Sequence, residues 1–222
     1  MPLTSDREIS PIIATDADVA RGVEFLVARE PRFARVVETH GMPPMRRVEN
    51  SLPSLLNIIT EQLISLKAAA AIWQRIEARL HPFEPVKILA FSHDDLKQLG
   101  LSGAKARCFQ AITAAVHTGE LNFQNLNEMS DQEAHAALLA LPGIGPWTAD
   151  IYVLAALGRA DVCASGDLAL QLAAQDLFAL NERPSPKAFL ALAEVWRPWR
   201  SVAARLLWSH YRGLKGLSQA VN

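Results

Sequence analysis

Residues 138–168 read LLALPGIGPWTADIYVLAALGRADVCASGDL, and the order of elements in this stretch decides the fold. A serine–glutamate capping box opens residues 130–140, where leucines recur at helical intervals until Pro142 ends the helix. Residues 143–145, Gly-Ile-Gly, predict a tight turn, because glycine adopts positive φ and allows another backbone to approach closely. Residues 147–157 are apolar on nearly all sides and predict a second helix. The expected arrangement is helix, glycine hairpin, helix.

A glycine turn that enters a helix points unpaired backbone N–H groups outward, and such groups suit phosphate oxygens. Gly143, Ile144 and Gly145 are therefore candidates for contacts with a nucleic-acid backbone. Taken alone, such a glycine pair is more typical of an αα-hairpin whose glycines only permit close packing. About twenty residues later, Asp167 follows Gly166 and is expected at the N-terminus of the next helix.

The run LPGIGPWTAD followed by Asp167 resembles the helix-hairpin-helix DNA glycosylase superfamily, and more narrowly its alkylated-base branch, the 3-methyladenine DNA glycosylase II type. Similar features extend from about residue 50 to the C-terminus. The resemblance implies an all-α, two-lobed fold with a DNA-binding cleft between the lobes. We expect residues 51–160 to form a central helical bundle with the hairpin, and residues 1–50 and 161–222 to form a second helical lobe from both chain ends.

The composition is that of a globular chain, with 222 residues of which 50% are hydrophobic. The sequence has neither an apolar run long enough to span a bilayer nor the basic and apolar start of a signal peptide, so we expect a cytoplasmic location without membrane contact. As a separate expectation, the protein is a monomer. Cys108 and Cys163 are far apart and predict neither a disulfide framework nor a metal cluster. We also expect no iron–sulfur cluster of the kind that some relatives hold with four C-terminal cysteines.

The formal net charge of −1 argues only weakly against nucleic acid, because the charge is unevenly distributed. Residues 187–222 carry six basic side chains opposed by Glu194 alone. This surplus is either a patch that faces phosphates or a set of side chains whose counter-charges come from neighbouring segments.

Periodicity and capping residues predict helices along most of the chain and no strand. Leucines and isoleucines from residue 52 onward form the longest stripe, which we expect to be two helices divided near Ser65. The remaining helices are expected over residues 15–28, 31–37, 92–99, 103–117, 168–178, 185–196 and 199–211, with a candidate boundary at residues 41–44.

Leu63 and Lys105 are further candidates for DNA contact. Gln62-Leu63-Ile64-Ser65 resembles the family's loop that enters the minor groove, and there Leu63 would replace the stacking lost when a base flips out. Leu63 also lies on the apolar stripe, where it would be a core residue. Lys105 ends a glycine-punctuated turn that is similar to a turn of the family, and we expect it to contact a phosphate. A plain helix start explains the same residues nearly as well.

Cleavage of an N-glycosidic bond develops positive charge on the sugar, and an anionic carboxylate can stabilise it. The resemblance assigns that role to Asp167, although an aspartate after glycine is also a common helix N-cap. Bifunctional relatives carry a lysine in the hairpin helix at the position of Trp147, and lysine is absent between Lys105 and Lys187. The implied enzyme is a monofunctional DNA glycosylase.

Alkylated purines such as 3-methyladenine and 7-methylguanine carry positive charge, and electron-rich rings attract such bases. Trp147 and Trp208 match aromatic pocket positions of the alkylated-base branch, whereas Trp196 and Trp199 match structural positions. Ile151 stands where the bacterial branch has a further aromatic residue, and Gly166 replaces an acidic residue, so the substrate range stays open. Hypoxanthine or uracil excision, a non-catalytic DNA-binding protein and a helical interaction scaffold are the alternatives.

The resemblance implies double-stranded DNA with alkylated bases as the partner and base excision repair as the process. No cofactor is expected to be required. Family members also bind a monovalent cation, Na⁺ or K⁺, through hairpin carbonyls, which here would be those of Leu139, Leu141 and Ile144. Carbonyl oxygens suit a hard cation and leave no side-chain signature in the sequence.

Overall fold

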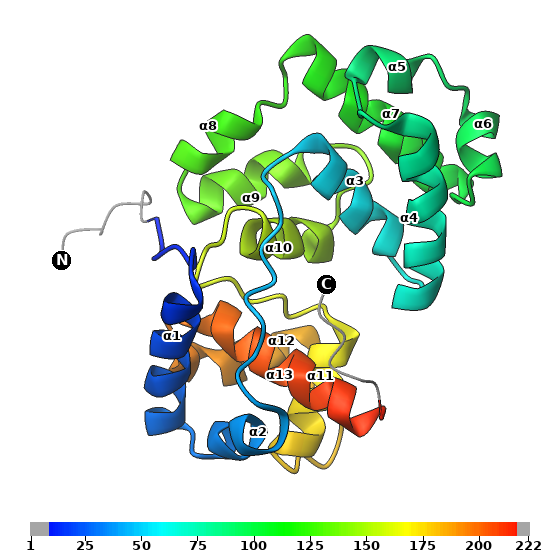
Figure 1. Ribbon diagram of the computed structural model, residues 1–222. Coiled ribbons are helices and arrows are strands. Elements are labelled where there is room, and N and C mark those ends of the chain that lie inside the picture. Colours follow the sequence, from blue (N-terminus) through cyan, green and yellow to red (C-terminus); the bar gives the residue numbers. More distant parts are fainter. Residues whose placement is uncertain (1–8, 217–222) are drawn as a thin grey trace. The chain divides into compact units, whose positions relative to one another are not determined.

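The protein is built from helices joined by loops, as a computed structural model that describes residues 9–216 shows (Figure 1). Within these residues the only β-type pairing is an isolated antiparallel bridge between Ile12 and Arg159. The all-α prediction is therefore confirmed. None of the described helices is both long and apolar enough to cross a membrane.

The chain divides into two compact units. Unit 1 comprises residues 1–47 and 153–222, and unit 2 comprises residues 48–152. The helices of unit 1, blue and yellow to red in Figure 1, are α1 (Asp16–Arg29), α2 (Arg32–His40), α11 (Leu168–Leu177), α12 (Pro186–Leu192), the 3-10 helix η1 (Ala193–Trp196) and α13 (Arg200–Leu214).

Unit 2 holds the helices drawn from cyan to green in Figure 1: α3 (Leu52–Glu61), α4 (Leu66–Leu80), α5 (Pro85–Leu89), α6 (His93–Gln98), α7 (Gly103–Thr118), α8 (Phe123–Glu128) and α9 (Asp131–Leu139). Helix α10 (Pro146–Ala155) begins in unit 2 and ends in unit 1. The short helices α5 and α8 were not predicted, because five or six residues do not display a helical period.

Local capping explains where most predicted helices begin. Thr15 and Ser130 each form a capping box with the acid three residues later, and Ser65 caps α4 after the break in the apolar stripe. One predicted helix differs from expectation at its end: after α12 the chain tightens into η1, which finishes at Trp196 before Pro198. A proline can neither continue the hydrogen-bond ladder nor tolerate a preceding α conformation.

An aromatic cluster forms part of the core of unit 1. Trp196 is 2% exposed and packs against Phe33, Phe178 and Phe189 at centroid distances of 5.6, 5.7 and 5.9 Å. The structural role expected of this tryptophan is therefore confirmed. Helix α13 packs on α1, α2 and α11, which brings both ends of the chain into one core.

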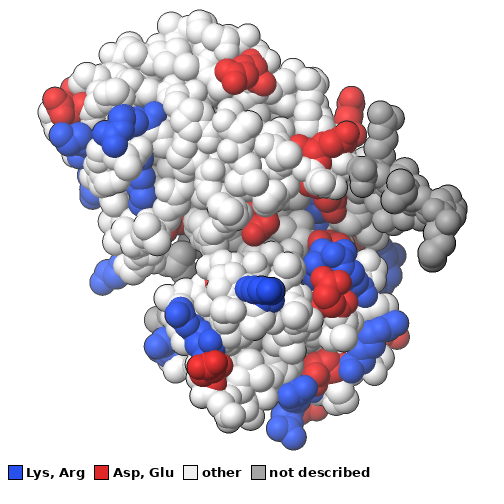
Figure 2. Space-filling view, turned by 180° about the vertical axis from the view of Figure 1, so that it is seen from behind, with Lys and Arg blue, Asp and Glu red and all other residues white. Residues whose placement is uncertain are grey.

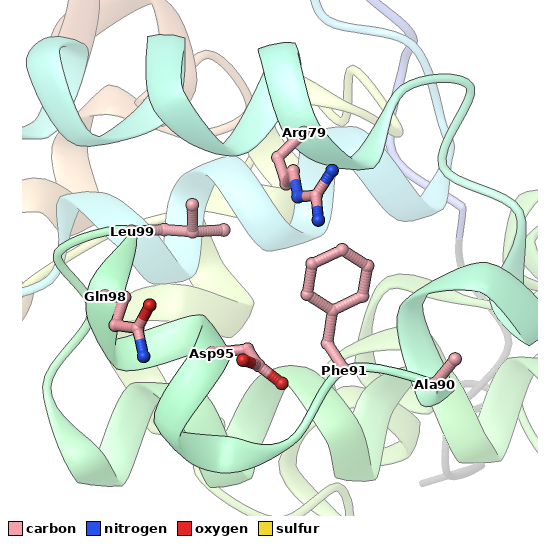
Figure 3. A pocket seen from close by; sticks show the side chains of 6 residues that line it. All are labelled: Arg79, Ala90, Phe91, Asp95, Gln98 and Leu99. Carbon is pink, nitrogen blue, oxygen red and sulfur yellow. The ribbon is translucent and has the colours of Figure 1, made fainter.

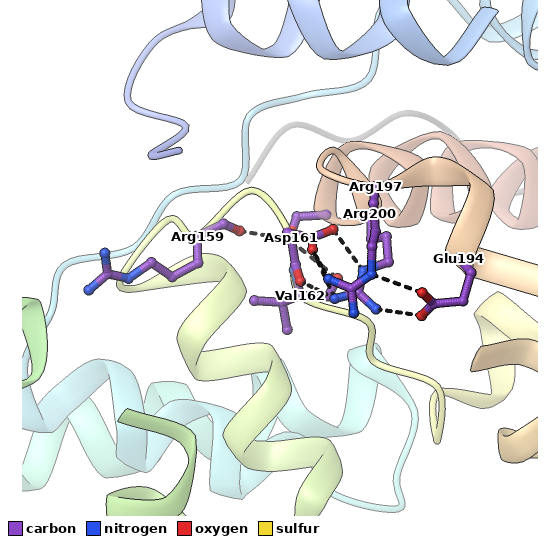
Figure 4. A network of polar contacts seen from close by, with 7 residues as sticks. Arg159, Asp161, Val162, Glu194, Arg197 and Arg200 are labelled. Atoms are coloured by element: carbon purple, nitrogen blue, oxygen red, sulfur yellow. Dashed lines mark hydrogen bonds and ion pairs between the residues drawn. The ribbon is translucent and has the colours of Figure 1, made fainter. Parts of the chain in front are cut away.

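A network of charged groups covers part of the same unit (Figure 4). Asp161 accepts from the guanidinium of Arg200 at 2.7 Å and also pairs with Arg197, and Glu194 pairs with both arginines. The side chains of Asp161 and Arg200 are only 10% and 9% exposed. Removing one member would leave a poorly solvated charge, which is the costly way to break such a pair.

Helix α7 lies at the centre of unit 2, where it packs on α3, α5 and α6. Phe109 and Ile112 of α7 and Leu55, Leu56 and Ile59 of α3 are fully buried. The apolar stripe of α3 thus forms the core that the sequence predicts, up to the end of the helix at Glu61.

Candidate functional site: a glycine hairpin with an exposed leucine, and a buried aspartate

The predicted hairpin is a tight turn between α9 and α10. The N–H of Ile144 donates to the carbonyl of Leu141 at 3.2 Å, and Gly143 has a φ of +83°. A Cβ at residue 143 would lie 2.8 Å from the Cβ of Cys108 in α7, so only glycine fits this approach. Nothing lies within 4 Å of the corresponding point at Gly145, which leaves that side of the turn open.

An ion pair joins the two helices of the hairpin. The Nε2 of His135 in α9 lies 3.0 Å from the Oδ1 of Asp150 in α10. The hydrogen bond to Asp150 raises the pKa of His135, and the charge of that carboxylate adds to the effect against the opposing cost of burial. The pair therefore links α9 to α10 on either side of the turn.

Leu63 is fully exposed, and its interpretation as a core residue is wrong. Its exposed fraction is 104%, and its φ of +58° is a left-handed conformation that a leucine adopts only at a cost of about 1–2 kcal/mol. The apolar stripe therefore ends at the end of α3, and the next leucine, Leu66, is 59% exposed as well. An exposed, strained leucine beside a glycine hairpin is an arrangement that folding alone does not favour.

Two side chains hold the turn at Leu63. The Nε2 of Gln62 donates to the Oγ1 of Thr148 at 2.8 Å and to the carbonyl of Gly143 at 3.4 Å. The Nζ of Lys105 donates to the carbonyls of Thr60 and Gln62 at 2.8 and 2.7 Å, and burial lowers the pKa of this lysine. Lys105 thus bonds to the turn, and its phosphate contact stays a prediction.

Asp167 is the N-cap of α11, as the sequence predicts. Its Oδ1 accepts from the N–H of Leu170 at 2.9 Å, and the residue is 9% exposed. The indole N–H of Trp208 in α13 donates to the same oxygen at 3.3 Å. The two donors fix the orientation of a buried carboxylate, which is a geometry suited to electrostatic stabilisation of a developing cation.

Trp208 has a second charged neighbour. The guanidinium carbon of Arg46 lies 5.7 Å from the centre of the Trp208 ring, within the range of a cation–π contact. Unit 1 therefore brings together two of the predicted site residues, Asp167 and Trp208. It adds Arg46, which could not be found from the sequence because Arg46 and Trp208 are distant in the chain. Trp147 is half-buried in the first turn of α10.

Three of the six basic residues after residue 186 form ion pairs or hydrogen bonds within unit 1. Arg197 and Arg200 pair with Asp161 and Glu194. Arg205 is 1% exposed and donates to the carbonyls of Met45 and Ser201, and burial, with smaller effects of two nearby arginines, lowers its pKa to about 9. On the face drawn in Figure 2, Lys and Arg side chains lie among Asp and Glu side chains.

The pocket in Figure 3 is not lined by any of the predicted site residues. Residues 9–216 contain no group of three His, Cys, Asp or Glu that could hold a metal ion. The pocket lies in unit 2 and is lined by Arg79, Ala90, Phe91, Asp95, Gln98 and Leu99. The guanidinium of Arg79 lies over the Phe91 ring at 5.4 Å, so two of the side chains that line the pocket contact each other.

The proposed monovalent cation would use backbone oxygens instead. The Leu141 carbonyl accepts a hydrogen bond from the N–H of Ile144, and a carbonyl oxygen has a second lone pair that can bind a cation. The other two carbonyls, of Leu139 and Ile144, lie at the end of α9 and in the turn. The donor set fits a hard cation, and the cation stays a prediction.

Known proteins show similar sequences and structures. A probable bifunctional transcriptional activator and DNA repair enzyme of Mycobacterium tuberculosis is 30% identical over 220 residues, which are 93% of this chain and 42% of that protein. The chain thus spans less than half the length of this relative. A crystal structure of a DNA-3-methyladenine glycosidase from Bacillus halodurans is 30% identical, with a TM-score of 0.74 over 88% of this chain and 91% of that one.

A third protein supports the fold. A 3-methyladenine DNA glycosylase of Schizosaccharomyces pombe, solved in complex with abasic DNA, has a TM-score of 0.80 and 22% identity over 91% of this chain and all of that chain (100%). The family model described as HhH-GPD superfamily base excision DNA repair protein matches residues 56–198, which include the exposed Leu63, the hairpin and the buried Asp167. The chain belongs to the HhH-GPD superfamily of base excision DNA repair proteins.

Proposed function

We propose that this protein is a monofunctional DNA glycosylase that hydrolyses the N-glycosidic bond of alkylated purines, of the 3-methyladenine and 7-methylguanine type, in double-stranded DNA. The observation that carries the proposal is the buried, doubly hydrogen-bonded carboxylate of Asp167 in a chain of the HhH-GPD superfamily. An anion in this setting stabilises the positive charge that develops on the sugar as the base leaves.

The remaining site residues take supporting roles in this proposal. The turn at Gly143–Gly145 binds the phosphate backbone, and Leu63 enters the base stack beside the flipped nucleotide. The ring of Trp147 and the ring of Trp208 each attract an electron-poor base by stacking and cation–π contact. An alkylated purine is already a good leaving group, so the site needs no general acid.

Hydrolysis without strand cleavage follows from the absence of lysine between Lys105 and Lys187. Without an amine in the hairpin helix, no Schiff base forms with the sugar, and water is the nucleophile. The proposed place of action is the cytoplasm, where the protein meets duplex DNA as a monomer. Na⁺ or K⁺ on the hairpin carbonyls would add a positive charge beside the phosphate.

A base-release assay tests the proposal. Purified protein is incubated with duplex DNA that carries methylated purines, and released bases are separated and identified. We expect free 3-methyladenine and 7-methylguanine, abasic DNA that stays intact until alkali is added, and no covalent complex after borohydride. Alkali-independent strand cleavage would contradict the monofunctional mechanism.

The alternatives give different results in the same assay. Parallel duplexes with hypoxanthine or uracil identify another lesion preference if either base is released faster than the methylated purines. A non-catalytic DNA-binding protein would bind duplex with a salt-dependent affinity and release nothing. A helical interaction scaffold would bind no DNA even at low salt.

A further inference from the structure

The turn that carries Leu63 is bonded on two sides within unit 2. On one side, Gln62 bridges from the turn to Thr148 in α10 at 2.8 Å and to the carbonyl of Gly143. On the other side, the ammonium of Lys105 in α7 donates to the carbonyls of Thr60 and Gln62, at the C-terminal end of α3. A cation is favourable there, because the last carbonyls of a helix lack partners within it.

The same two neighbours of the turn also touch each other. Gly143 in the hairpin packs directly on Cys108 in α7, where a Cβ would lie 2.7 Å from the Cys108 sulfur. The Leu63 turn, the hairpin and α7 are thus three segments of which each contacts the other two. Movement of one member would break contacts with both others.

We propose that Gln62 and Lys105 are positioning residues that hold Leu63 at a fixed place relative to the hairpin, so that phosphate binding and wedge insertion occur as one event. The inference rests on the proposed function and assigns Lys105 a task different from a phosphate contact. Fixing the leucine before DNA arrives lowers the entropic cost of inserting it.

The decisive experiment is a double-mutant cycle on duplex DNA with an alkylated purine, under single-turnover conditions. Lys105→Met keeps the length of the side chain and removes its donors, and Leu63→Ala removes the wedge. We expect each single variant to slow base release on the order of tenfold. The double variant should be no slower than Leu63→Ala, because without the wedge nothing remains to be positioned.

Salt dependence separates positioning from phosphate contact. If Lys105 binds a phosphate, Lys105→Met weakens DNA binding, reduces the slope of log affinity against log salt by about one and combines multiplicatively with Leu63→Ala, which would overturn the inference. If Lys105 positions the wedge, the salt slope stays and the loss falls on the base-release step. The loss should also be smaller on single-stranded DNA, which has no opposing stack to hold open.

Two further variants guard against a trivial loss of folding. Lys87→Met is the matched control, because the ammonium of Lys87 also donates to a backbone carbonyl. That carbonyl belongs to His81, which is not part of the Leu63 turn. Base release by Lys87→Met should equal that of the unaltered protein. Gln62→Ala breaks the tie to Thr148 and should reproduce the pattern of Lys105→Met, including its lack of additivity with Leu63→Ala; full additivity would contradict the inference.

A binding measurement keeps the inference separate from the proposed chemistry. In a duplex with a stable abasic-site analogue beside 2-aminopurine, insertion of Leu63 changes the fluorescence of 2-aminopurine without any base release. We expect a large change with the unaltered protein and Lys87→Met, and a reduced one with Lys105→Met, Gln62→Ala and Leu63→Ala. If the protein releases no base but shows this pattern, the proposed function fails and the positioning role holds. Equal signals from all variants would overturn the positioning role.

Discussion

The Leu63 turn and the surroundings of Asp167 differ in the exposure of their central side chains. In unit 2 an apolar side chain, Leu63, is fully exposed in a left-handed conformation. In unit 1 an ionisable side chain, Asp167, is 9% exposed and bonded to Leu170 and Trp208. Both placements are unusual, because leucines are usually buried and carboxylates usually solvated, although Asp167 also caps α11.

The difference indicates what each region does. An exposed leucine gains nothing until it meets an apolar partner, and a duplex offers one between its bases. A buried carboxylate acts at full strength on a charge beside it, because little water screens the interaction. Substitutions that exchange these preferences should therefore alter function and stability in different directions in the two regions.

The largest effect is expected for Asp167→Asn. Asparagine caps a helix about as well as aspartate, so the free energy of unfolding should change little, whereas base release should fall by a factor on the order of a hundred or more. Duplex binding should persist. Asp176→Asn on the same helix α11 is the control, because Asp176 is an exposed partner of His210 and its loss should leave release intact. Equal rates for Asp167→Asn and the unaltered protein would remove Asp167 from the mechanism.

Trp208→Phe should have a smaller effect on the same chemistry. Phenylalanine keeps an aromatic face for the base but cannot donate to Asp167, and the loss of one hydrogen bond to a charged group corresponds to about 1.5 kcal/mol, or roughly tenfold in rate. Single-turnover release measures this change. Trp73→Phe, which alters a ring stacked on Phe83 in unit 2, should leave the rate unchanged.

The local parts of both regions could be predicted from the sequence. Asp167 follows a glycine and precedes an apolar period, so its N-cap position is decided by neighbours within four residues. The hairpin is equally local, because Gly143 and Gly145 flank a single apolar residue. The family motif then supplied the chemistry that a cap alone does not imply.

The parts that could not be predicted depend on contacts between distant residues. A break near Ser65 is predicted, but the apolar spacing continues through Leu63, so the pattern alone does not decide whether Leu63 belongs to the core stripe or to the turn. The turn at Leu63 is bonded by Lys105, which lies 42 positions after Leu63, and by Thr148, which lies 86 positions after its partner Gln62. Arg46 beside Trp208 is a contact of the same kind, and so is the pairing of Arg200 with Asp161.

The ion pair between His135 and Asp150 gives a pH test of the hairpin region. The pKa of His135 is raised in the folded protein, so the pair contributes stability that is fully present below the ordinary value of 6.5 and is lost as the pH rises through the folded pKa. The pair is partly exposed, so we expect about 1 kcal/mol or less. Urea unfolding of the unaltered protein and His135→Gln should differ at about pH 5.5 and converge near pH 9. A gap that widens with pH would contradict this assignment.

The smallest effect has the most informative sign. Leu63→Asn should raise the free energy of unfolding by about 0.5 kcal/mol, because asparagine tolerates the left-handed conformation better than leucine and no buried surface is lost. Leu190→Asn is the matched control: Leu190 is also exposed, at 42%, but lies within α12, where asparagine lowers stability by about 0.5 kcal/mol through helix propensity. Urea unfolding measures both. If Leu63→Asn is more stable and no longer inserts into DNA, the leucine serves DNA binding at the expense of stability. If Leu63→Asn is less stable, the exposed side chain contributes to the fold of unit 2.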